Sequence, residues 1–405
     1  MFLSKKSAQA SEVSKDGSSP DFAYMKPDSC YLDSACQTLR PQCVIDAEME
    51  YYREYNACGG RVKYAWGSMV DDKVQQARKL LLQFSGKREK EYCVAFTLNT
   101  SYGINLVLHQ LTTGAFSRII TSDREHNSVV LPSMTWAKRA GAERLILESA
   151  DDGSVLYTPS QLERSIVLMQ SVSNIDGRTT KNLQQLANDT HAQGGILLVD
   201  AAQGFGHDVE GLRDIDFDAA FGSGHKMYGP SIGFIVIKRS LLDRLDPFFI
   251  GGGTVSDVDL EKYSLLRSGD EAHAVLEVGL QNWGGILGLG AAVEWLNQQQ
   301  PRKENEKALA ETLFQGLRSH PRVRLLNHTA SHVVSFHVDG IDSHQLALYL
   351  SQQEIMCRSG YFCCHSYLHH QMKLPPLLRV SLGLHATSAH IETFLSALTK
   401  ILSAL

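Results

Sequence analysis

The sequence predicts an α/β protein whose large domain is built on a mostly parallel sheet. Strand-like apolar runs alternate with segments of helical periodicity through most of the chain. The 405 residues are 43% hydrophobic and 20% charged, which is typical of a globular protein large enough for two lobes. Polar residues also follow the ends of several predicted strands, where ligands of such sheets bind.

We expect three parts along the chain: a polar N-terminal tail over residues 1–28, a large domain over 29–285 and a small C-terminal α+β domain over 286–405. In the large domain the predicted strands are 92–98, 118–122, 144–148, 165–171, 195–200 and 233–238, after a short extended piece at 31–36. Predicted helices cover about 41–55, 70–84 and 182–192, and one more begins near Tyr102. The small domain is expected to hold helices at 305–317, 343–353 and 388–402 and strands at 332–338 and 378–382, after a helix that begins near 286.

Composition limits the class of partner. The net charge of −5 and the pI near 6.3 argue against a nucleic-acid or anionic-membrane surface, so small molecules are the expected ligands. The polar first twenty residues contain no apolar run long enough for a signal peptide or membrane span. The eight cysteines show no C-x-x-C spacing, which favours reduced thiols in a cytoplasmic protein over disulfides, and we predict no metal site.

The most informative stretch is Phe221-Gly-Ser-Gly-His-Lys-Met-Tyr-Gly-Pro230, which contains Lys226. It follows the predicted strand 195–200, which ends in Asp200, 26 residues before the lysine. Taken alone, Lys226 would be a solvated loop lysine. A lysine in a glycine-rich turn, paired with an aspartate at a strand end, indicates instead a pyridoxal phosphate (PLP) site. There the amine forms a Schiff base, and the carboxylate keeps the pyridine nitrogen protonated.

A second polar turn, Asn99-Thr100-Ser101, lies between a predicted strand and a predicted helix. Free backbone N–H groups at a helix start favour a bound anion, so this turn is a candidate phosphate site. Capping of the helix by Thr100 or Ser101 is the more frequent use of such residues, and the two uses are compatible.

Two segments together carry a family resemblance: Asp200-Ala201-Ala202-Gln203 and Ser223 to Pro230. The chain resembles fold-type I, class V PLP enzymes, and within them the SUF-type cysteine desulfurases and selenocysteine lyases, over residues 31–394. The resemblance implies a fold-type I transferase with Lys226 as the Schiff-base lysine and Asp200 as the partner of the pyridine nitrogen. It also implies Gln203 as a donor near the phenolic oxygen of PLP, and His126 stacked on the ring, although a lone histidine is more often structural.

The same resemblance assigns further residues. It places the cofactor phosphate on Thr100, Ser101, Ser223 and His225, and Asn174 near the substrate carboxylate and a cofactor oxygen. Ala35 corresponds to a backbone contact with the substrate. In the C-terminal domain, Arg379 matches the arginine that binds the substrate α-carboxylate, a task that suits a planar guanidinium. The alternative interpretation of Arg379 is an arginine on the exposed surface of a strand.

The segment Arg358-Ser-Gly-Tyr-Phe-Cys363-Cys364 resembles the family's Arg-x-Gly-x-x-Cys loop. Counting from the arginine places the sulfur-accepting nucleophile at Cys363, with Cys364 where the family usually has a small residue. Buried, inert thiols are the common alternative for both.

Several positions depart from the family pattern. Leu280 replaces a threonine that reaches the phosphate of the neighbouring subunit, so Thr254 or Gln281 would have to take its place. The family's His-Arg pair in the early substrate loop becomes Gly60-Arg61, which leaves Arg61 as a candidate substrate contact. Tyr102 replaces a glutamate after the phosphate turn. These changes bear on substrate identity more than on the cofactor.

The expected function is therefore a homodimeric cysteine desulfurase that moves sulfur from L-cysteine to an enzyme cysteine, releases alanine and serves a sulfur-acceptor protein. Other class V reactions form the alternative: aminotransferase, β-lyase, epimerase or selenocysteine lyase. A scaffold without catalysis is a third hypothesis, which the presence of Lys226, Asp200 and His126 together disfavours.

Overall fold

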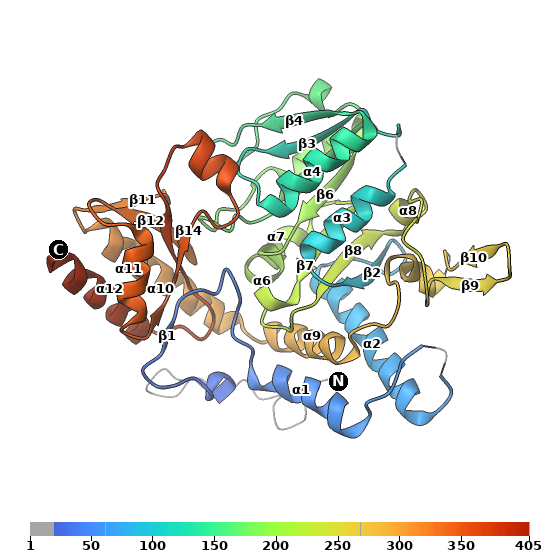
Figure 1. Ribbon diagram of the computed structural model, residues 1–405, viewed down its shortest axis with the longest axis horizontal. Helices are drawn as coiled ribbons and strands as arrows, with labels where there is room; N and C mark the ends of the chain where they lie inside the picture. Colours follow the sequence, from blue (N-terminus) through green and yellow to red (C-terminus); the bar gives the residue numbers. More distant parts are fainter. Residues whose placement is uncertain (1–19, 61, 113, 268, 405) are drawn as a thin grey trace.

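The computed structural model describes residues 20–60, 62–112, 114–267 and 269–404 and shows two lobes side by side (Figure 1). The predicted tail lies outside the described residues up to residue 19. Beyond that point Phe22 is buried and packs edge-on against Trp295, with ring centroids 5.9 Å apart. The segment after residue 20 is therefore part of the folded structure.

The large lobe is organised on a seven-stranded sheet in the order β2-β8-β7-β6-β5-β3-β4. Strand β8 runs opposite to the other six strands, which are parallel to one another, so the predicted mostly parallel sheet is confirmed. The bounds are β2 (Tyr92–Thr97), β3 (Arg118–Ser122), β4 (Glu143–Leu147), β5 (Ser165–Gln170), β6 (Ile196–Asp200), β7 (Ala219–Ser223) and β8 (Gly233–Lys238).

Helices cover both faces of this sheet, which explains why its strands read as continuous apolar runs. Side chains alternate along a strand, so in β6 Leu197 and Val199 join one core while Ile196 and Leu198 join the other. The first core is shared with α1 (Gln42–Glu54), α2 (Ala65–Phe84), α5 (Leu183–Ala192), α6 (Gly204–His207), α7 (Val209–Arg213) and α9 (Trp283–Leu296). The second is shared with α3 (Thr100–Gln110), α4 (Asn127–Ala140) and α8 (Arg239–Leu242).

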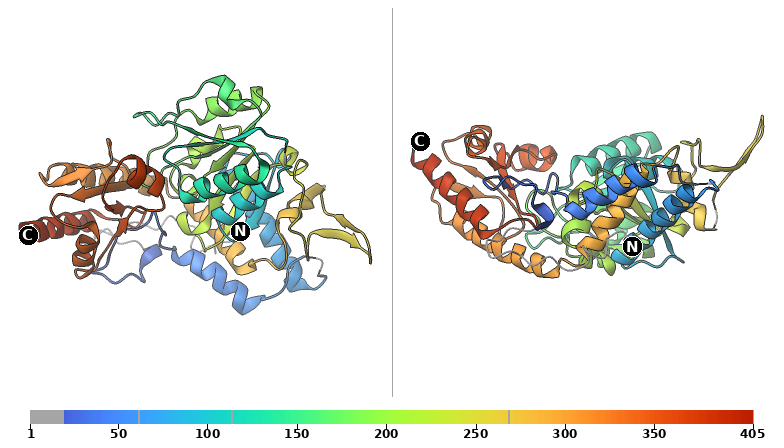
Figure 2. Two further views of the ribbon diagram at one scale, coloured as in Figure 1. Left: turned by 45° about the horizontal axis from the view of Figure 1, so that its top comes forward. Right: turned by 90° about the horizontal axis from the view of Figure 1, so that it is seen from below.

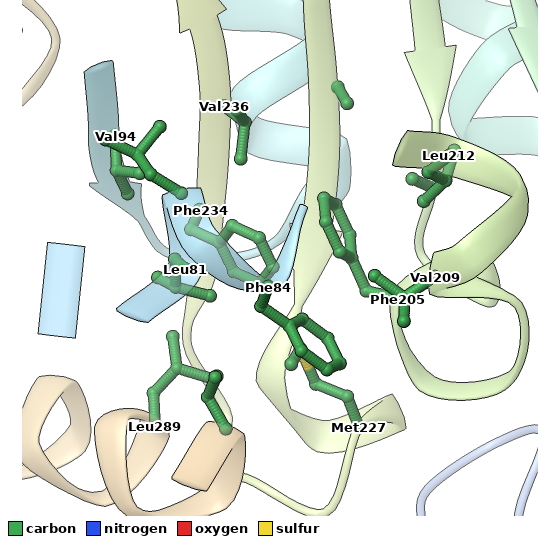
Figure 3. Packing of buried hydrophobic residues seen from close by; sticks show 14 of the residues in the cluster. Leu81, Phe84, Val94, Phe205, Val209, Leu212, Met227, Phe234, Val236 and Leu289 are labelled. Carbon is green, nitrogen blue, oxygen red and sulfur yellow. The ribbon is translucent and has the colours of Figure 1, made fainter. Parts of the chain in front are cut away.

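The first core also anchors the loop that carries Lys226. Met227, the next residue, is fully buried in the same cluster as Phe84, Phe205 and Leu289 (Figure 3). Since the side chain of Met227 is fixed in this packing, the backbone of Lys226 is held against the sheet.

The small lobe contains the antiparallel sheet β11-β12-β15-β14. Its strands are β11 (Val323–Leu325), β12 (Val333–Val338), β14 (Arg358–Gly360) and β15 (Leu377–Ser381), and its helices are α10 (Gln300–Arg318), α11 (Ser343–Ser351) and α12 (Ser388–Ser403). The N-terminal segment joins this lobe, because β1 (Cys30–Tyr31) pairs in parallel with β13 (Ile355–Met356). Helix α9 spans residue 286 and packs on α1 and α2 of the large lobe. The domain boundary predicted near residue 286 stays a prediction.

Most predicted elements are confirmed within a few residues. The structure also differs from expectation in several places, among them the unpredicted helix α4 and the features that follow. The extended piece at 31–36 is a strand only over Cys30–Tyr31. Residues 221–223 belong to β7, and the turn with Lys226 is one 3-10 turn, Gly224–Lys226. A hairpin of β9 (Val255–Val258) and β10 (Tyr263–Leu265) was not predicted and projects from the end of the large lobe away from the small lobe (Figure 2).

Within the described ranges, no helix combines the length and the apolar character needed to cross a membrane.

Candidate active site

A cavity of about 400 Å³ lies where the carboxyl ends of the parallel strands meet the small lobe. It brings together twelve of the residues singled out in the sequence: Ala35, Thr100, Ser101, His126, Asn174, Asp200, Gln203, Ser223, His225, Lys226, Cys363 and Arg379. Two predicted residues are not among its lining: Thr254 lies elsewhere, and Arg61 is outside the described residues. Sequence reasoning assigned no role to four polar residues that also line it: Cys36, Ser128, Gln170 and Arg358.

Asp200 and Lys226 lie together in this cavity, where Asp200 is buried and Lys226 is half-buried. Asp200 is the last residue of β6, and its Oδ1 accepts a hydrogen bond from the Ala202 N–H at 3.0 Å. Burial lowers the pKa of Lys226, and the nearby Asp200 carboxylate opposes that shift. A lysine whose neutral amine is favoured by burial suits nucleophilic attack on an aldehyde.

The backbone beside Lys226 requires a glycine on the facing helix. A Cβ atom at Gly206, in α6, would lie 2.3 Å from the Lys226 carbonyl oxygen. On its other side, the Tyr228 N–H donates to Thr38 Oγ1 at 2.8 Å, although Tyr228 has the left-handed φ of 64°. The lysine loop is thus held from both sides in a backbone conformation that non-glycine residues rarely adopt.

The start of α3 has the properties expected of a phosphate site. Asn99 caps this helix through Oδ1, which accepts from the Tyr102 N–H at 2.9 Å. Capping by Thr100 or Ser101 is therefore wrong, and the buried Thr100 Oγ1 has no hydrogen-bond partner within the described structure. Such an unpaired hydroxyl beside free N–H groups fits an anion that completes its hydrogen bonds.

Further hydroxyls and an imidazole border the same region. Ser101 Oγ lies 2.5 Å from Ser128 Oγ, and Ser223 Oγ lies 2.8 Å from His225 Nδ1. Burial, followed by the positive charge of Lys226, lowers the pKa of His225 to about 4. His225 is thus neutral near pH 7.

His126 precedes α4, and its Nδ1 accepts a hydrogen bond from the Ser128 N–H at 3.0 Å. Burial, with the charges of Lys226, Arg379 and Arg358, lowers the pKa of His126 to about 3. The ring is therefore a neutral imidazole whose proton sits on Nε2. A flat, neutral ring that lines this cavity suits stacking against an aromatic cofactor.

Arg379 occupies the centre of β15 and is 2% exposed, so the alternative of a surface arginine is wrong. Its Nη1 donates to the Asn174 carbonyl oxygen and its Nη2 to Asp33 Oδ1, each at 3.0 Å. The buried Nε has no partner in the described structure. Gln203 is similar: its Nε2 donates to the Ala35 carbonyl at 2.8 Å, while its buried Oε1 remains without a partner.

The two adjacent cysteines lie in different environments. Cys363 is exposed and lines the cavity, whereas Cys364 is fully buried, and burial raises the pKa of its thiol. Phe362 and Cys363 have left-handed φ angles of 49° and 59°. Hydrogen bonds from Asn174 Nδ2 to the Phe362 carbonyl (2.8 Å) and from the Asn127 N–H to the Cys363 carbonyl (2.7 Å) hold this loop. Non-glycine residues with left-handed φ angles carry backbone strain, and such strain often marks a functional loop.

The segments predicted to reach a neighbouring subunit form a separate region. Thr254 Oγ1 donates to the Gly251 carbonyl of its own turn at 2.8 Å, and the Gly279 N–H donates to the Gly252 carbonyl at 2.8 Å. Leu280, beside them, is 77% exposed and borders a second cavity of about 540 Å³.

The residues of the first cavity fit pyridoxal phosphate. A half-buried lysine, a buried aspartate, a neutral imidazole, and a helix start with an unpaired hydroxyl correspond to the aldehyde, pyridine nitrogen, ring face and phosphate of that molecule.

Comparison with known proteins agrees with this geometry. The family model described as aminotransferase class-V matches residues 30–394. The chain is 31% identical to a probable cysteine desulfurase from Pyrococcus abyssi, covering 93% of this chain and 94% of the relative, and 32% identical to one from Haemophilus influenzae, covering 93% and 86%. Its structure is similar to that of a cysteine desulfurase from Thermococcus onnurineus, with a TM-score of 0.84 and 29% identity over 93% of this chain and 96% of that one.

Proposed function

This chain belongs to the aminotransferase class-V family of PLP-dependent enzymes, and on that premise we propose that it is a cysteine desulfurase. The observation that carries the proposal is one cavity that holds a half-buried lysine, a buried arginine and an exposed thiol. A desulfurase needs these three groups to bind the cofactor, the amino-acid carboxylate and the sulfur.

The proposed role of Arg379 is to bind the α-carboxylate of L-cysteine. Its guanidinium is oriented by Asn174 and Asp33, and its unpaired Nε is available to a ligand. This contact would place the α-carbon of the substrate near Lys226.

Lys226 is proposed to move the α-proton, since burial favours the neutral amine that can accept it. When bound, pyridoxal phosphate draws electrons from the substrate α-carbon. Asp200 would hold a proton on the pyridine nitrogen, Gln203 would contact the phenolic oxygen, and Thr100, Ser101, Ser223 and His225 would bind the phosphate.

Cys363 is the proposed sulfur acceptor. Its thiolate would attack the sulfur of the substrate and form an S–S bond as the carbon–sulfur bond breaks. The electron pair of the broken bond would stay on the substrate β-carbon, which takes up a proton, and the carbon skeleton would leave as alanine. Cys364 does not line the cavity, and its thiol donates a hydrogen bond to Asn174 Oδ1 at 3.2 Å, which suits a structural role.

We also propose that the protein works as a cytoplasmic homodimer. Exposed apolar side chains gather on the projecting hairpin and on the glycine segments beside it: Val258, Leu260, Tyr263 and Leu280. Surfaces of this kind favour a protein interface. Of the two predicted substitutes for the family threonine, Gln281 would then serve the partner's phosphate site, since Thr254 is fully buried and its hydroxyl is bonded within its own turn. Light scattering of the PLP-loaded protein should give twice the chain mass, and a fully loaded monomer would refute the dimer.

The function is tested by incubating the PLP-loaded protein with L-cysteine and a reductant. We expect alanine and sulfide in equal amounts. Pyruvate and ammonia would indicate a β-lyase, D-cysteine an epimerase, and alanine from selenocysteine alone a selenocysteine lyase; each of these results would contradict the proposal. The sulfur-acceptor protein can then be sought with the persulfide form.

A further inference from the structure

A second thiol, Cys36, lies in the same cavity as Cys363 and Lys226. It is half-buried, and its Sγ is in hydrogen-bond contact with Nη1 of Arg358 on β14 of the small lobe. The negative charge of either thiolate would raise the pKa of Lys226, so both sulfurs are within electrostatic reach of the same amine. Nothing in the sequence around Cys36 singles it out, since Arg358 is 322 residues away.

The backbone around Cys36 is fixed by both lobes. The Ala35 N–H donates to Ser381 Oγ at 2.9 Å, and the Ala35 carbonyl accepts from Gln203 Nε2. The Cys36 N–H donates to the Asp33 carbonyl at 3.0 Å. Arg358 in turn pairs with Arg379 in the antiparallel β14–β15 register. The contact between Cys36 and Arg358 therefore joins two rigid segments.

Among the cysteines of the described chain, Cys36 and Cys363 are the two that line this cavity. Cys364 is fully buried behind it, and Cys58 is exposed beside the second cavity. A guanidinium next to a sulfur stabilises the thiolate, which is the nucleophilic form of cysteine. The site thus holds a second nucleophile within the same enclosed space as the proposed persulfide.

We propose that Cys36 is a second sulfur carrier, which takes the outer sulfur of the Cys363 persulfide. The Cys36 thiolate attacks the outer sulfur, the bond between that sulfur and Cys363 Sγ breaks, and the electron pair stays on Cys363 as a thiolate. The persulfide on Cys36 keeps the proton of the transferred sulfur, so no oxidant or reductant is needed. Cys363 is then free for another substrate while one sulfur is stored beside Arg358.

This inference rests on the proposed desulfurase function. Mass spectrometry distinguishes a failure of the carrier role from a failure of that function. The PLP-loaded protein is mixed with L-cysteine without reductant, alkylated at successive times and digested. We expect an extra sulfur first on the Cys363 peptide and later on the Cys36 peptide. The half-buried Cys43, which lines neither cavity, is the internal control that stays unmodified. Cys363→Ser should lose both modifications, whereas Cys36→Ser should retain the one on Cys363.

Sulfur on Cys363 but never on Cys36 would overturn the carrier role and leave the desulfurase function intact. Sulfur on Cys36 in Cys363→Ser would overturn the order of transfer, and a Cys36–Cys363 disulfide would show attack on the inner sulfur instead. If no alanine forms and Cys363 stays unmodified, the function itself fails.

The contact with Arg358 is tested without turnover. In the PLP-loaded protein, Arg358→Gln should slow alkylation of Cys36 while that of Cys58 is unchanged, and Arg358→Lys should restore part of the rate. An unchanged rate for Cys36 in Arg358→Gln would show that the guanidinium does not activate this thiol.

Discussion

The Cys364 thiol donates a 3.2 Å hydrogen bond to Asn174 Oδ1, while its neighbour Cys363 faces the cavity. Asn174 Nδ2 also donates to the Phe362 carbonyl, so one buried amide holds the backbone before Cys363 and the side chain of the residue after it. The pair of cysteines is therefore a nucleophile beside a structural thiol, and the two should respond differently to substitution.

Lys226 should carry the cofactor. Borohydride reduction of the PLP-loaded protein, followed by peptide mapping, is expected to find a pyridoxyl group on Lys226, because this lysine lines the cavity together with Asp200. Lys238, which is paired with Asp216 outside the cavity, is the control lysine. A label on any other lysine, or none with PLP in excess, would contradict the cofactor assignment.

Arg379→Lys should weaken substrate binding through the carboxylate. Hydrogen bonds to charged groups contribute about 1.5–3 kcal/mol, so we expect KM for L-cysteine to rise about tenfold or more. Binding of cysteamine, which has no carboxylate, should change little. Arg324→Lys, at an exposed pair with Asp339, is the matched control. Equal effects on both ligands would point to a structural defect.

Arg78 and Glu277 form a buried, two-pronged ion pair with both N–O distances at 2.6 Å. Glu277 Oε1 also accepts from the Phe96 N–H at 2.6 Å, which ties the segment before Leu280 to β2. Arg78→Met leaves this carboxylate buried without its partner and should cost about 3–5 kcal/mol of unfolding free energy.

Urea denaturation measures this loss, and the exposed pair of Arg88 with Glu91 supplies the control. Arg88→Met should cost less than about 1 kcal/mol. Equal losses of unfolding free energy in the two variants would show that the buried ion pair contributes no more to stability than the exposed one.

Glu306 should make stability depend on pH. Burial raises its pKa to about 8, so the folded state holds a proton on Glu306 that the unfolded chain releases at lower pH. The stabilisation from this proton is fully present below the pKa of Glu306 in the unfolded chain and is lost as pH rises through its pKa in the folded state. The total loss of unfolding free energy is on the order of a few kcal/mol.

Glu306→Gln cannot titrate, so its unfolding free energy should fall less than that of the wild type between about pH 5 and pH 9. Glu304→Gln, exposed on the same helix, is the control and should follow the wild type. Parallel curves for the wild type and Glu306→Gln would refute the raised pKa.

Much of the fold and site could be predicted because burial on both faces of a parallel sheet leaves continuous apolar runs, and ligand residues follow the strand ends. Asp200 at the end of β6 and Lys226 after β7 are examples. The helix cap could not be assigned, since Asn99 and Thr100 are both good capping residues.

Other features depend on contacts that leave no local signal. The orientation of Cys363 depends on left-handed backbone at residues 362 and 363, which neither side chain favours. The contact of Cys36 with Arg358 joins distant parts of the sequence. Neither could be obtained from residue preferences or spacing.

The most direct test of the account is a single turnover with L-cysteine in the absence of reductant. The wild type and Cys364→Ala should each release one alanine for every sulfur retained on the protein, because Cys364 does not face the cavity. Cys363→Ala should still bind PLP and L-cysteine, as seen in the absorption spectrum, but should retain no sulfur and lose most alanine formation. If Cys363→Ala forms alanine at the wild-type rate, sulfur transfer to Cys363 is not the reaction of this protein.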